Sequence, residues 1–255
     1  MSLATATEAE GAIPESIAKR ITSRWEFFDW RAAEVSRGRP MIFANRQQAG
    51  RSLVRHLEKY ANRNDVVVLG VPRGGVPVAA EVADALQAPL DVFLLRKLGV
   101  PGHEELAFGA IASKGVRVLD EGTIAAISIS SADIVAVTAR ELVELERREI
   151  TYRGTRPALP VNDRTVILVD DGIATGASLL AGIRALRELH PAKIVAAVPV
   201  APPASCERLA REVDKFVCVA APGDFRAVGQ FYDDFSPVGD EEVIETLARN
   251  RRKPA

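Results

Sequence analysis

The sequence lacks most of the features that mark membrane, secreted and metal-binding proteins. No apolar run approaches the roughly 20 residues that a membrane-spanning helix needs, and no apolar core with a cleavage site opens the chain. Only 2 cysteines and 3 histidines occur among the 255 residues. Cys206 and Cys218 form no CxxC pair and no cluster with histidine, so we expect buried structural thiols in a reducing cytoplasm.

An excess of charge of one sign is also missing. The 33 Lys and Arg residues nearly balance the 34 Asp and Glu residues, which leaves a net charge of −1. We therefore expect no bulk attraction to nucleic acid, and the sequence has no basic stripe or helix-turn-helix pattern. An apolar content of 47% and a charged content of 26% are typical of a soluble globular protein. A cytoplasmic protein without nucleic-acid or membrane partners is expected.

The amino end differs from the rest of the chain. Residues 1–14 are small and polar, and we expect them to be disordered. Residues 15–40 predict an amphipathic helical extension, which carries both tryptophans, Trp25 and Trp30. Its apolar stripe would pack on the domain surface or contact a partner, such as the second subunit of a homodimer. Residues 41–249 form the expected globular domain.

Apolar stretches of strand length alternate with helical patterns along this domain. The pattern predicts a buried strand at 65–71, a helix at 76–86 and a strand at 90–95. The same alternation returns between residues 165 and 219. Short strands that alternate with helices predict an α/β fold with a doubly wound, mostly parallel sheet.

The middle of the domain interrupts this alternation. Residues 96–105 are charged and contain two glycines and a proline, which predicts a mobile loop. Residues 107–112 and 116–119 predict the two strands of a hairpin. Residues 131–152 predict a long surface helix, because charges of both signs alternate along it.

One stretch combines several features of a ligand site. Residues 166–169 suit a parallel strand that is covered on both faces, and Asp170 and Asp171 follow at its carboxyl end, where open α/β sheets bind ligands. The small residues of 172–178 then form a turn that opens a helix, whose N–H groups and dipole favour an anion. Two acids beside an anion site suit a sugar phosphate, or a Mg²⁺ ion between carboxylate and phosphate.

Two further strand ends carry groups that suit an anionic ligand. Residues 71–75 follow the first buried strand, and their two glycines would let the backbone approach a ligand closely. Arg73 can make a forked contact with phosphate, although a plain strand-to-helix turn would look similar. Arg96 and Lys97 are adjacent cations at the end of another expected strand.

The segment VILVDDGIATGAS at 166–178 resembles the phosphoribosyl pyrophosphate (PRPP) signature of type I phosphoribosyltransferases. That signature is a run of aliphatic residues, two acids, a Thr-Gly pair and a small hydroxylic residue. The resemblance covers about 41–247 and is greatest to an uncharacterised bacterial and archaeal branch of the family. It implies the fold of that family, with a small hood formed by the amino- and carboxyl-terminal segments.

The resemblance also implies a role for each candidate site residue. Asp170 and Asp171 would bind the ribose hydroxyls of PRPP, and they would also hold Mg²⁺. The residues that would hold the 5′-phosphate are Ala174, Thr175, Gly176, Ala177 and Ser178. Those that would hold the pyrophosphate are Pro72, Arg73, Gly74 and Gly75. A flexible loop would supply the catalytic residues Arg96, Lys97 and Glu105, with Glu104 as an alternative to Glu105.

The implied reaction is the Mg-assisted displacement of pyrophosphate from C1 of PRPP by a nitrogen nucleophile. Its partners would be PRPP and a small-molecule acceptor of nucleotide metabolism. Ala174 stands where the hypoxanthine and guanine enzymes of the family carry an acid for the purine ring, so a 6-oxopurine acceptor is disfavoured. Gly172 stands where a bulky aliphatic residue is common, which predicts a looser turn.

Two other functions remain open. A PRPP-binding regulator would keep the acid pair and the Thr-Gly turn but needs no catalytic loop, so the charged stretch 96–105 favours an enzyme. A hydrolase with Asp170 as nucleophile would want a second acid at position 172, where Gly172 stands. The aromatic residues of 225–235 would either stack on a flat base or form a satellite core.

Overall fold

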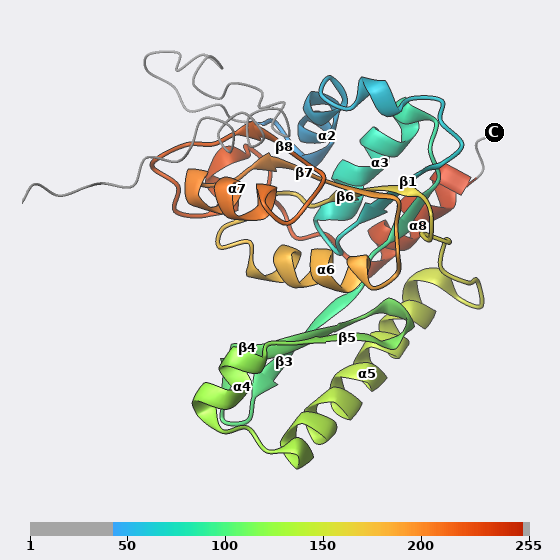
Figure 1. The fold of residues 1–255 in the computed structure, drawn as a ribbon. Coiled ribbons are helices and arrows are strands. Elements are labelled where there is room, and N and C mark those ends of the chain that lie inside the picture. The colour runs from blue at the N-terminus through green and yellow to red at the C-terminus, as the bar shows by residue number, and fades with distance from the viewer. Residues whose placement is uncertain (1–42, 252–255) are drawn as a thin grey trace, which may run out of the picture.

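A five-stranded parallel sheet forms the centre of the computed structural model, which describes residues 43–251 (Figure 1). The expected amino-terminal segments, 1–14 and 15–40, lie outside the described residues. The strand order is β2-β1-β6-β7-β8. The strands are β1 (Val66–Gly70), β2 (Leu90–Val92), β6 (Thr165–Val169), β7 (Lys193–Val200) and β8 (Lys215–Ala220). The doubly wound parallel sheet expected from the alternating pattern is confirmed.

Helices cover both faces of this sheet. Successive residues of β1 point to opposite faces, and all of them are apolar, so both faces must be covered. Val66 and Val68 lie in one hydrophobic core with residues of α2, α3 and α8, whereas Val67 and Leu69 lie in a second core with residues of α6 and α7. A strand buried on both faces carries apolar residues throughout. The helices are α2 (Arg46–Val54), α3 (Gly75–Leu86), α6 (Ala177–Arg187), α7 (Pro203–Ala210) and α8 (Asp240–Arg251), with short 3₁₀ turns η1 (Glu58–Tyr60) and η3 (Val228–Phe231).

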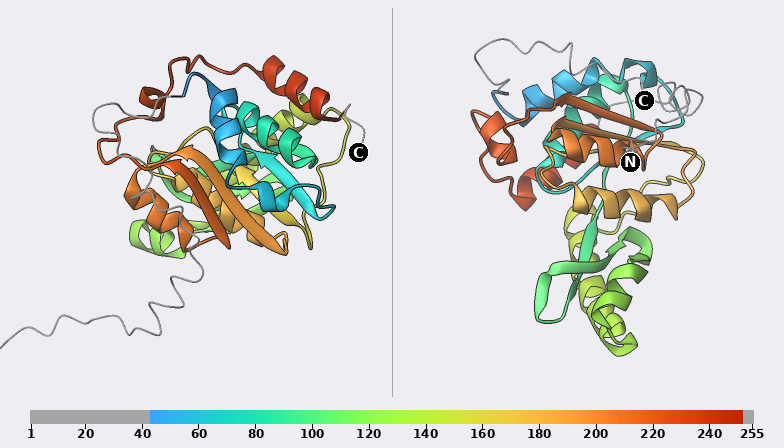
Figure 2. Two further views of the ribbon diagram at one scale, coloured as in Figure 1. Left: turned by 90° about the horizontal axis from the view of Figure 1, so that it is seen from above. Right: turned by 60° about the vertical axis from the view of Figure 1, so that its left-hand side comes forward.

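The chain leaves the sheet after β2 and forms an arm that projects beside α6 (Figure 1; Figure 2, right). The arm is an antiparallel sheet in the order β3-β4-β5 with two helices. Its elements are β3 (Leu95–Val100), β4 (His103–Ala112), the 3₁₀ turn η2 (Ser113–Gly115), β5 (Val116–Leu119), α4 (Glu121–Ile127) and α5 (Ser131–Arg153). The expected hairpin at 107–119 and the expected long helix are confirmed, and Ser130 caps that helix by accepting the Asp133 N–H at 3.1 Å.

The expectation of a mobile loop at 96–105 was wrong. This stretch forms most of a second hairpin, in which β3 pairs with β4 from Leu95–Ala112 to Val100–His103. Pro101 and Gly102 make its two-residue turn, and Gly102 has a φ of +76°. Proline followed by a glycine with positive φ is the usual pair for a tight turn, so the residues that suggested a loop are those that reverse the chain between two strands.

The start of the described chain pairs with the segment that follows β8 and η3. Phe43 forms an isolated β-bridge with Tyr232, and its N–H donates to the Phe231 carbonyl oxygen at 2.8 Å. The N–H of Asp234 donates to the Ala44 carbonyl oxygen at 3.1 Å. The segment that enters α2 is therefore held to the segment that follows β8, in the place where a hood was expected.

Candidate functional site

The two adjacent acids lie at the carboxyl end of β6, between the ends of β1 and β7. The register from Val66–Thr165 to Gly70–Val169 ends β1 and β6 at the same level, and the Val71 N–H donates to the Val169 carbonyl oxygen at 2.9 Å. The segments 71–75 and 170–176 therefore leave the sheet side by side. The sequence predicted this placement because parallel strands of equal length present their carboxyl ends at one edge.

Asp170 is partly buried, and among residues 43–251 no cationic side chain pairs with it. Its Oδ1 accepts the N–H of Asp171 at 2.9 Å. Burial, followed by the charge of the neighbouring Asp171, raises the pKa of Asp170 well above its usual range. Burial also raises the pKa of Asp171, and the guanidinium of Arg46 counteracts part of that rise. The acid pair is thus a site where a bound cation or hydroxyl donors would stabilise the ionised form.

Arg46 is a residue of this site whose role the sequence did not reveal. Its Nε donates to Asp171 Oδ2 at 2.8 Å, and its Nη1 donates to the Ser236 carbonyl oxygen at 2.8 Å. The guanidinium carbon lies 4.0 Å from the centroid of the Phe235 ring. On the other side, the Tyr232 hydroxyl donates to the Asp171 carbonyl oxygen at 2.6 Å. Asp171 is therefore held in place from both the start and the end of the domain.

The turn after the acids is oriented by α7. The Ser205 hydroxyl donates to the Ala174 carbonyl oxygen at 2.6 Å, and Arg208 Nη2 donates to the Thr175 carbonyl oxygen. In a trans peptide unit the N–H points opposite to the C=O, so the N–H groups of Thr175 and Gly176 point away from α7. Neither N–H has an acceptor within residues 43–251. Together with the amino end of α6, they present N–H donors at the position where the sequence predicted an anion site.

The structure explains the glycine at position 172 differently from the sequence. A looser turn was expected there, but the space is filled. A Cβ atom on Gly172 would lie 2.5 Å from Val228 Cγ1 and 3.0 Å from Val200 Cγ1, and its φ of +150° is one that side chains rarely adopt. The η3 turn thus packs directly onto the backbone of the candidate site.

The Pro72–Gly75 turn touches the acid pair. A Cβ atom on Gly74 would overlap the Asp171 carboxylate, and one on Gly75 would lie 2.8 Å from the Val169 carbonyl oxygen. The two glycines are therefore required by close packing against 169–171. Arg73 is half-exposed, and its Nη1 lies 3.8 Å from Asp240 Oδ1. A weak, exposed ion pair of this kind leaves its guanidinium able to exchange partners.

The candidate catalytic residues of the arm lie in different surroundings. Arg96 donates from Nη2 to Glu141 Oε2 at 2.6 Å, so it is engaged with α5 inside the arm. Lys97 is exposed, and it shares a face of β3 with Leu95, which lies against Gly182 of α6. The backbone of Glu105 belongs to β4, while its side chain lies outside what the structure describes.

The aromatic tail belongs mainly to the core. Phe231 is buried, and the Phe225 ring stacks on it with a centroid distance of 5.3 Å. The rings of Tyr232 and Phe235 are 4.9 Å apart. These contacts agree with the interpretation of 225–235 as a satellite core rather than as a surface that stacks on a base. No signal in the sequence marked Ser205 or Arg208.

No metal cage of protein side chains accompanies the acid pair. Within residues 43–251, no group of three or more His, Cys, Asp and Glu side chains could hold a metal ion. Asp170 and Asp171 fit Mg²⁺ in another way, because this ion is commonly held by one or two carboxylates together with substrate phosphates and water. In the same part of the chain, no helix has the length and apolar character to cross a membrane.

Comparisons with known proteins agree with this geometry. The family model of the phosphoribosyl transferase domain matches residues 41–236. A protein of Mycobacterium tuberculosis H37Rv, provisionally named phosphoribosyl transferase Rv0571c, is 46% identical over 211 residues, which are 83% of this chain and 47% of that protein. The same values hold for MT0597 of strain CDC 1551, so the chain spans about half the length of the curated relatives it matches.

A solved structure extends the similarity to the fold. The crystal structure of TT1426 from Thermus thermophilus aligns with a TM-score of 0.74 at 41% sequence identity. The alignment covers 82% of this chain and 99% of that chain. The fold is therefore shared with a protein of known structure.

Proposed function

The chain belongs to the phosphoribosyl transferase domain family, and we propose that it is a PRPP-dependent phosphoribosyltransferase. It would displace pyrophosphate from C1 of PRPP by a nitrogen nucleophile of a nucleobase-like acceptor. The observation that carries this proposal is the packing of Gly74 and Gly75 against Asp170 and Asp171. This packing brings a turn suited to pyrophosphate directly beside groups suited to a ribose phosphate. PRPP contains a pyrophosphate and a ribose phosphate in one molecule.

The ribose end of PRPP would lie on β6 and the turn that follows it. The carboxylates of Asp170 and Asp171 would accept hydrogen bonds from the two ribose hydroxyls, which would favour the ionised acids despite their burial. The outward N–H groups of Thr175 and Gly176, with the amino end of α6 at Ala177 and Ser178, would hold the 5′-phosphate. Binding at both ends would fix the position of C1 between them.

The pyrophosphate end would lie on the Pro72–Gly75 turn. Arg73 would exchange its long contact with Asp240 for a forked contact with the leaving group. Lys97 of the arm would make a second contact with the pyrophosphate, because its side chain is exposed, whereas Arg96 is paired with Glu141. These charges would stabilise the pyrophosphate as it leaves a cationic, oxocarbenium-like sugar. Asp170 and Asp171 would hold Mg²⁺ together with the substrate, and the ion would neutralise part of the phosphate charge.

The acceptor would enter beside Ala174. This position is exposed and has no acid to recognise a purine ring nitrogen, which disfavours a 6-oxopurine. Cys206 and Cys218 are free thiols, which suits an enzyme that acts in the reducing cytoplasm. A homodimer remains part of this proposal.

Calorimetric titration with PRPP and MgCl₂ tests the binding half of the proposal. We expect the wild type to bind PRPP and the Asp170→Asn/Asp171→Asn variant to lose that binding. The exposed acids Asp163 and Asp224 offer a matched control, because Asp163→Asn/Asp224→Asn removes the same charge away from the site and should bind normally. Absence of PRPP binding by the wild type would overturn the proposal.

Pyrophosphate release across a panel of nitrogen bases tests the catalytic half. One or more bases other than hypoxanthine and guanine should release pyrophosphate, and Lys97→Met should lower kcat more than it weakens PRPP binding. PRPP binding without turnover across the whole panel would instead identify a PRPP-binding regulator. The two measurements therefore separate an enzyme from a sensor.

A further inference from the structure

A cavity opens beside the start of β2 and the end of α8, away from the residues of the candidate PRPP site. Its volume is about 750 Å³, within the range of roughly 300–1,000 Å³ that is usual for small-molecule sites. Asn64 and Leu90 line it, and these residues lie at the starts of β1 and β2. The candidate PRPP site follows the carboxyl end of β1, about 16 Å from its start for five residues of strand. Leu90 and Asp91 pair in register with Val68 and Leu69, but the lining of the cavity shares no residue with 72–75 or 170–178. This cavity is therefore separate from the family site.

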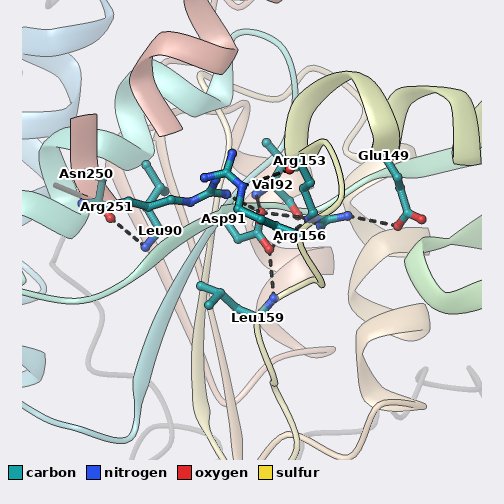
Figure 3. A network of polar contacts seen from close by, with 9 residues as sticks. All are labelled: Leu90, Asp91, Val92, Glu149, Arg153, Arg156, Leu159, Asn250 and Arg251. Atoms are coloured by element: carbon teal, nitrogen blue, oxygen red, sulfur yellow. Dashed lines mark hydrogen bonds and ion pairs between the residues drawn. The ribbon is translucent and has the colours of Figure 1, made fainter. Parts of the chain in front are cut away.

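Asp91 forms part of the cavity wall and already has its full set of partners. It is 2% exposed, and Arg153 Nε donates to its two carboxylate oxygens at 3.0 and 3.1 Å. The N–H groups of Val92 and Leu159 donate to it at 2.8 and 3.0 Å. The buried side chain of Arg153, which does not line the cavity, thus neutralises the charge of Asp91 (Figure 3).

Two further arginines, Arg156 and Arg251, also line the cavity. Figure 3 shows both near Asp91, with Arg251 coming from α8. Arg251 Nη2 is 3.9 Å from Asp91 Oδ1, a long contact with a carboxylate that Arg153 already pairs. Arg156 donates from Nε to the Arg153 carbonyl oxygen at 3.0 Å, and its two terminal nitrogens have no acceptor within residues 43–251. The cavity thus presents two guanidinium groups whose remaining N–H donors are available to a ligand.

The remaining lining divides into an apolar part and a polar part that is already engaged. Pro89, Pro157 and Leu159 supply apolar surface, whereas Leu90 is only 1% exposed. The one other carboxylate of the lining, Asp84, accepts a hydrogen bond from Asn250 at 3.1 Å, and Asn250 in turn accepts the Leu90 N–H at 3.0 Å. Apolar walls with a few convergent charged groups are typical of a site for an amphiphilic small molecule.

We propose that this cavity binds a small phosphorylated molecule with a flat, largely apolar body, of the chemical class of the nucleoside 5′-monophosphates. Arg156 and Arg251 would hold the phosphate, since guanidinium groups pair with phosphate oxygens through two parallel hydrogen bonds. The base would lie on the side chains of Pro89, Pro157 and Leu159. This assignment does not depend on the reaction at the PRPP site.

Titration calorimetry with the four common ribonucleoside 5′-monophosphates tests the proposal, and the corresponding nucleosides report the contribution of the phosphate. The probes could also enter the PRPP site, so the titrations are made on the Asp170→Asn/Asp171→Asn variant as well. We expect binding of at least one monophosphate to persist there. Arg156→Ala/Arg251→Ala should weaken it about tenfold or more, because two charge-assisted contacts are lost. Arg55→Ala/Arg117→Ala, which removes two exposed arginines elsewhere, should not.

Photolabelling with 8-azidoadenosine 5′-monophosphate and peptide mapping provides an independent readout on the wild-type protein. Label on the peptide that contains 154–159 supports the proposal. Binding that is unchanged in Arg156→Ala/Arg251→Ala overturns it, as does label confined to 170–178 or 225–235. Equal affinity for nucleoside and monophosphate would overturn the phosphate assignment, and absence of binding by all four probes would overturn the ligand class.

Discussion

Arg46 and Asp171 lie 125 residues apart in the chain, and their side chains are joined by a hydrogen-bonded ion pair of 2.8 Å. The pair is largely buried, with 10% of the Arg46 side chain and 14% of the Asp171 side chain exposed. It fixes one member of the acid pair to the first helix of the domain. Asp170, in contrast, makes no ion pair within the part of the chain that the structure describes, 43–251. The two adjacent acids are therefore unequal, because Arg46 holds Asp171 whereas Asp170 accepts only the backbone N–H of Asp171 among these residues.

Replacing Arg46 by methionine should lower the free energy of unfolding by about 3 kcal/mol, because a partly buried carboxylate is left without its partner. Urea denaturation followed by circular dichroism measures this change. Arg51→Met is the matched control, since Arg51 makes an exposed pair with Glu81 that is worth less than about 1 kcal/mol. Adding Asp171→Asn to Arg46→Met should recover part of the loss. Equal losses of stability in the two arginine variants would show that the Arg46–Asp171 pair stabilises the fold no more than the exposed Arg51–Glu81 pair does.

Asp170→Asn should stabilise the protein at neutral pH while removing PRPP binding. A raised pKa means that the stability contribution of Asp170 is fully present below its unfolded-state pKa and is lost as the pH rises through its folded-state pKa. Asparagine has no charge to desolvate and keeps the oxygen that accepts the Asp171 N–H. We expect a rise in Tm at pH 7 of about 2–4 °C, equivalent to about 1 kcal/mol for a domain of this size, which shrinks toward pH 4. A gain that grows at acid pH would contradict this.

Gly172→Ala should destabilise the fold by about 2–3 kcal/mol, since its Cβ would meet Val228 and its φ is unfavourable for a side chain. Val228→Ala removes the nearest methyl groups, so the double variant should be more stable than the sum of the two single effects predicts. A double-mutant cycle by thermal denaturation measures this coupling. Additive effects would mean that the η3 turn does not press on the site.

Ser205→Ala should weaken PRPP binding about three- to tenfold with a smaller effect on folding, because one hydrogen bond that orients the phosphate turn is lost. Titration with PRPP and Mg²⁺ measures it. Ser52→Ala is a matched control, since the Ser52 hydroxyl also donates to a backbone carbonyl, that of Gln48, but within α2. If both substitutions leave the affinity unchanged, α7 does not orient the turn.

Much of the site could be predicted from the sequence because its main elements are local. An uninterrupted apolar run followed by two acids and a small-residue turn predicts a buried strand, its carboxyl end and a helix start within one stretch. The Pro72–Gly75 turn follows the same logic on β1. The equal register of β1 and β6 then brought the two turns together, as parallel pairing requires.

The arm shows where local reasoning was insufficient. Charge and turn residues at 96–105 suggested a loop, yet β3 forms because β4 supplies its hydrogen-bonding partner, and Glu141 of α5 neutralises Arg96. Strand formation depends on a partner strand as much as on the residues themselves. The partner's contribution cannot be judged from either segment alone.

The sequence by itself determined the α/β alternation, the strand-end acids and the small-residue turn that opens α6, since each follows from the spacing of neighbouring residues. Only the tertiary structure decided that Arg46 pairs with Asp171, what fills the space at Gly172 and that Arg156 and Arg251 line one cavity. These relationships join segments from different parts of the chain, and packing selects them. The periodicity of a strand or helix fixes the direction of a side chain, but the residue that it meets is fixed by the fold as a whole.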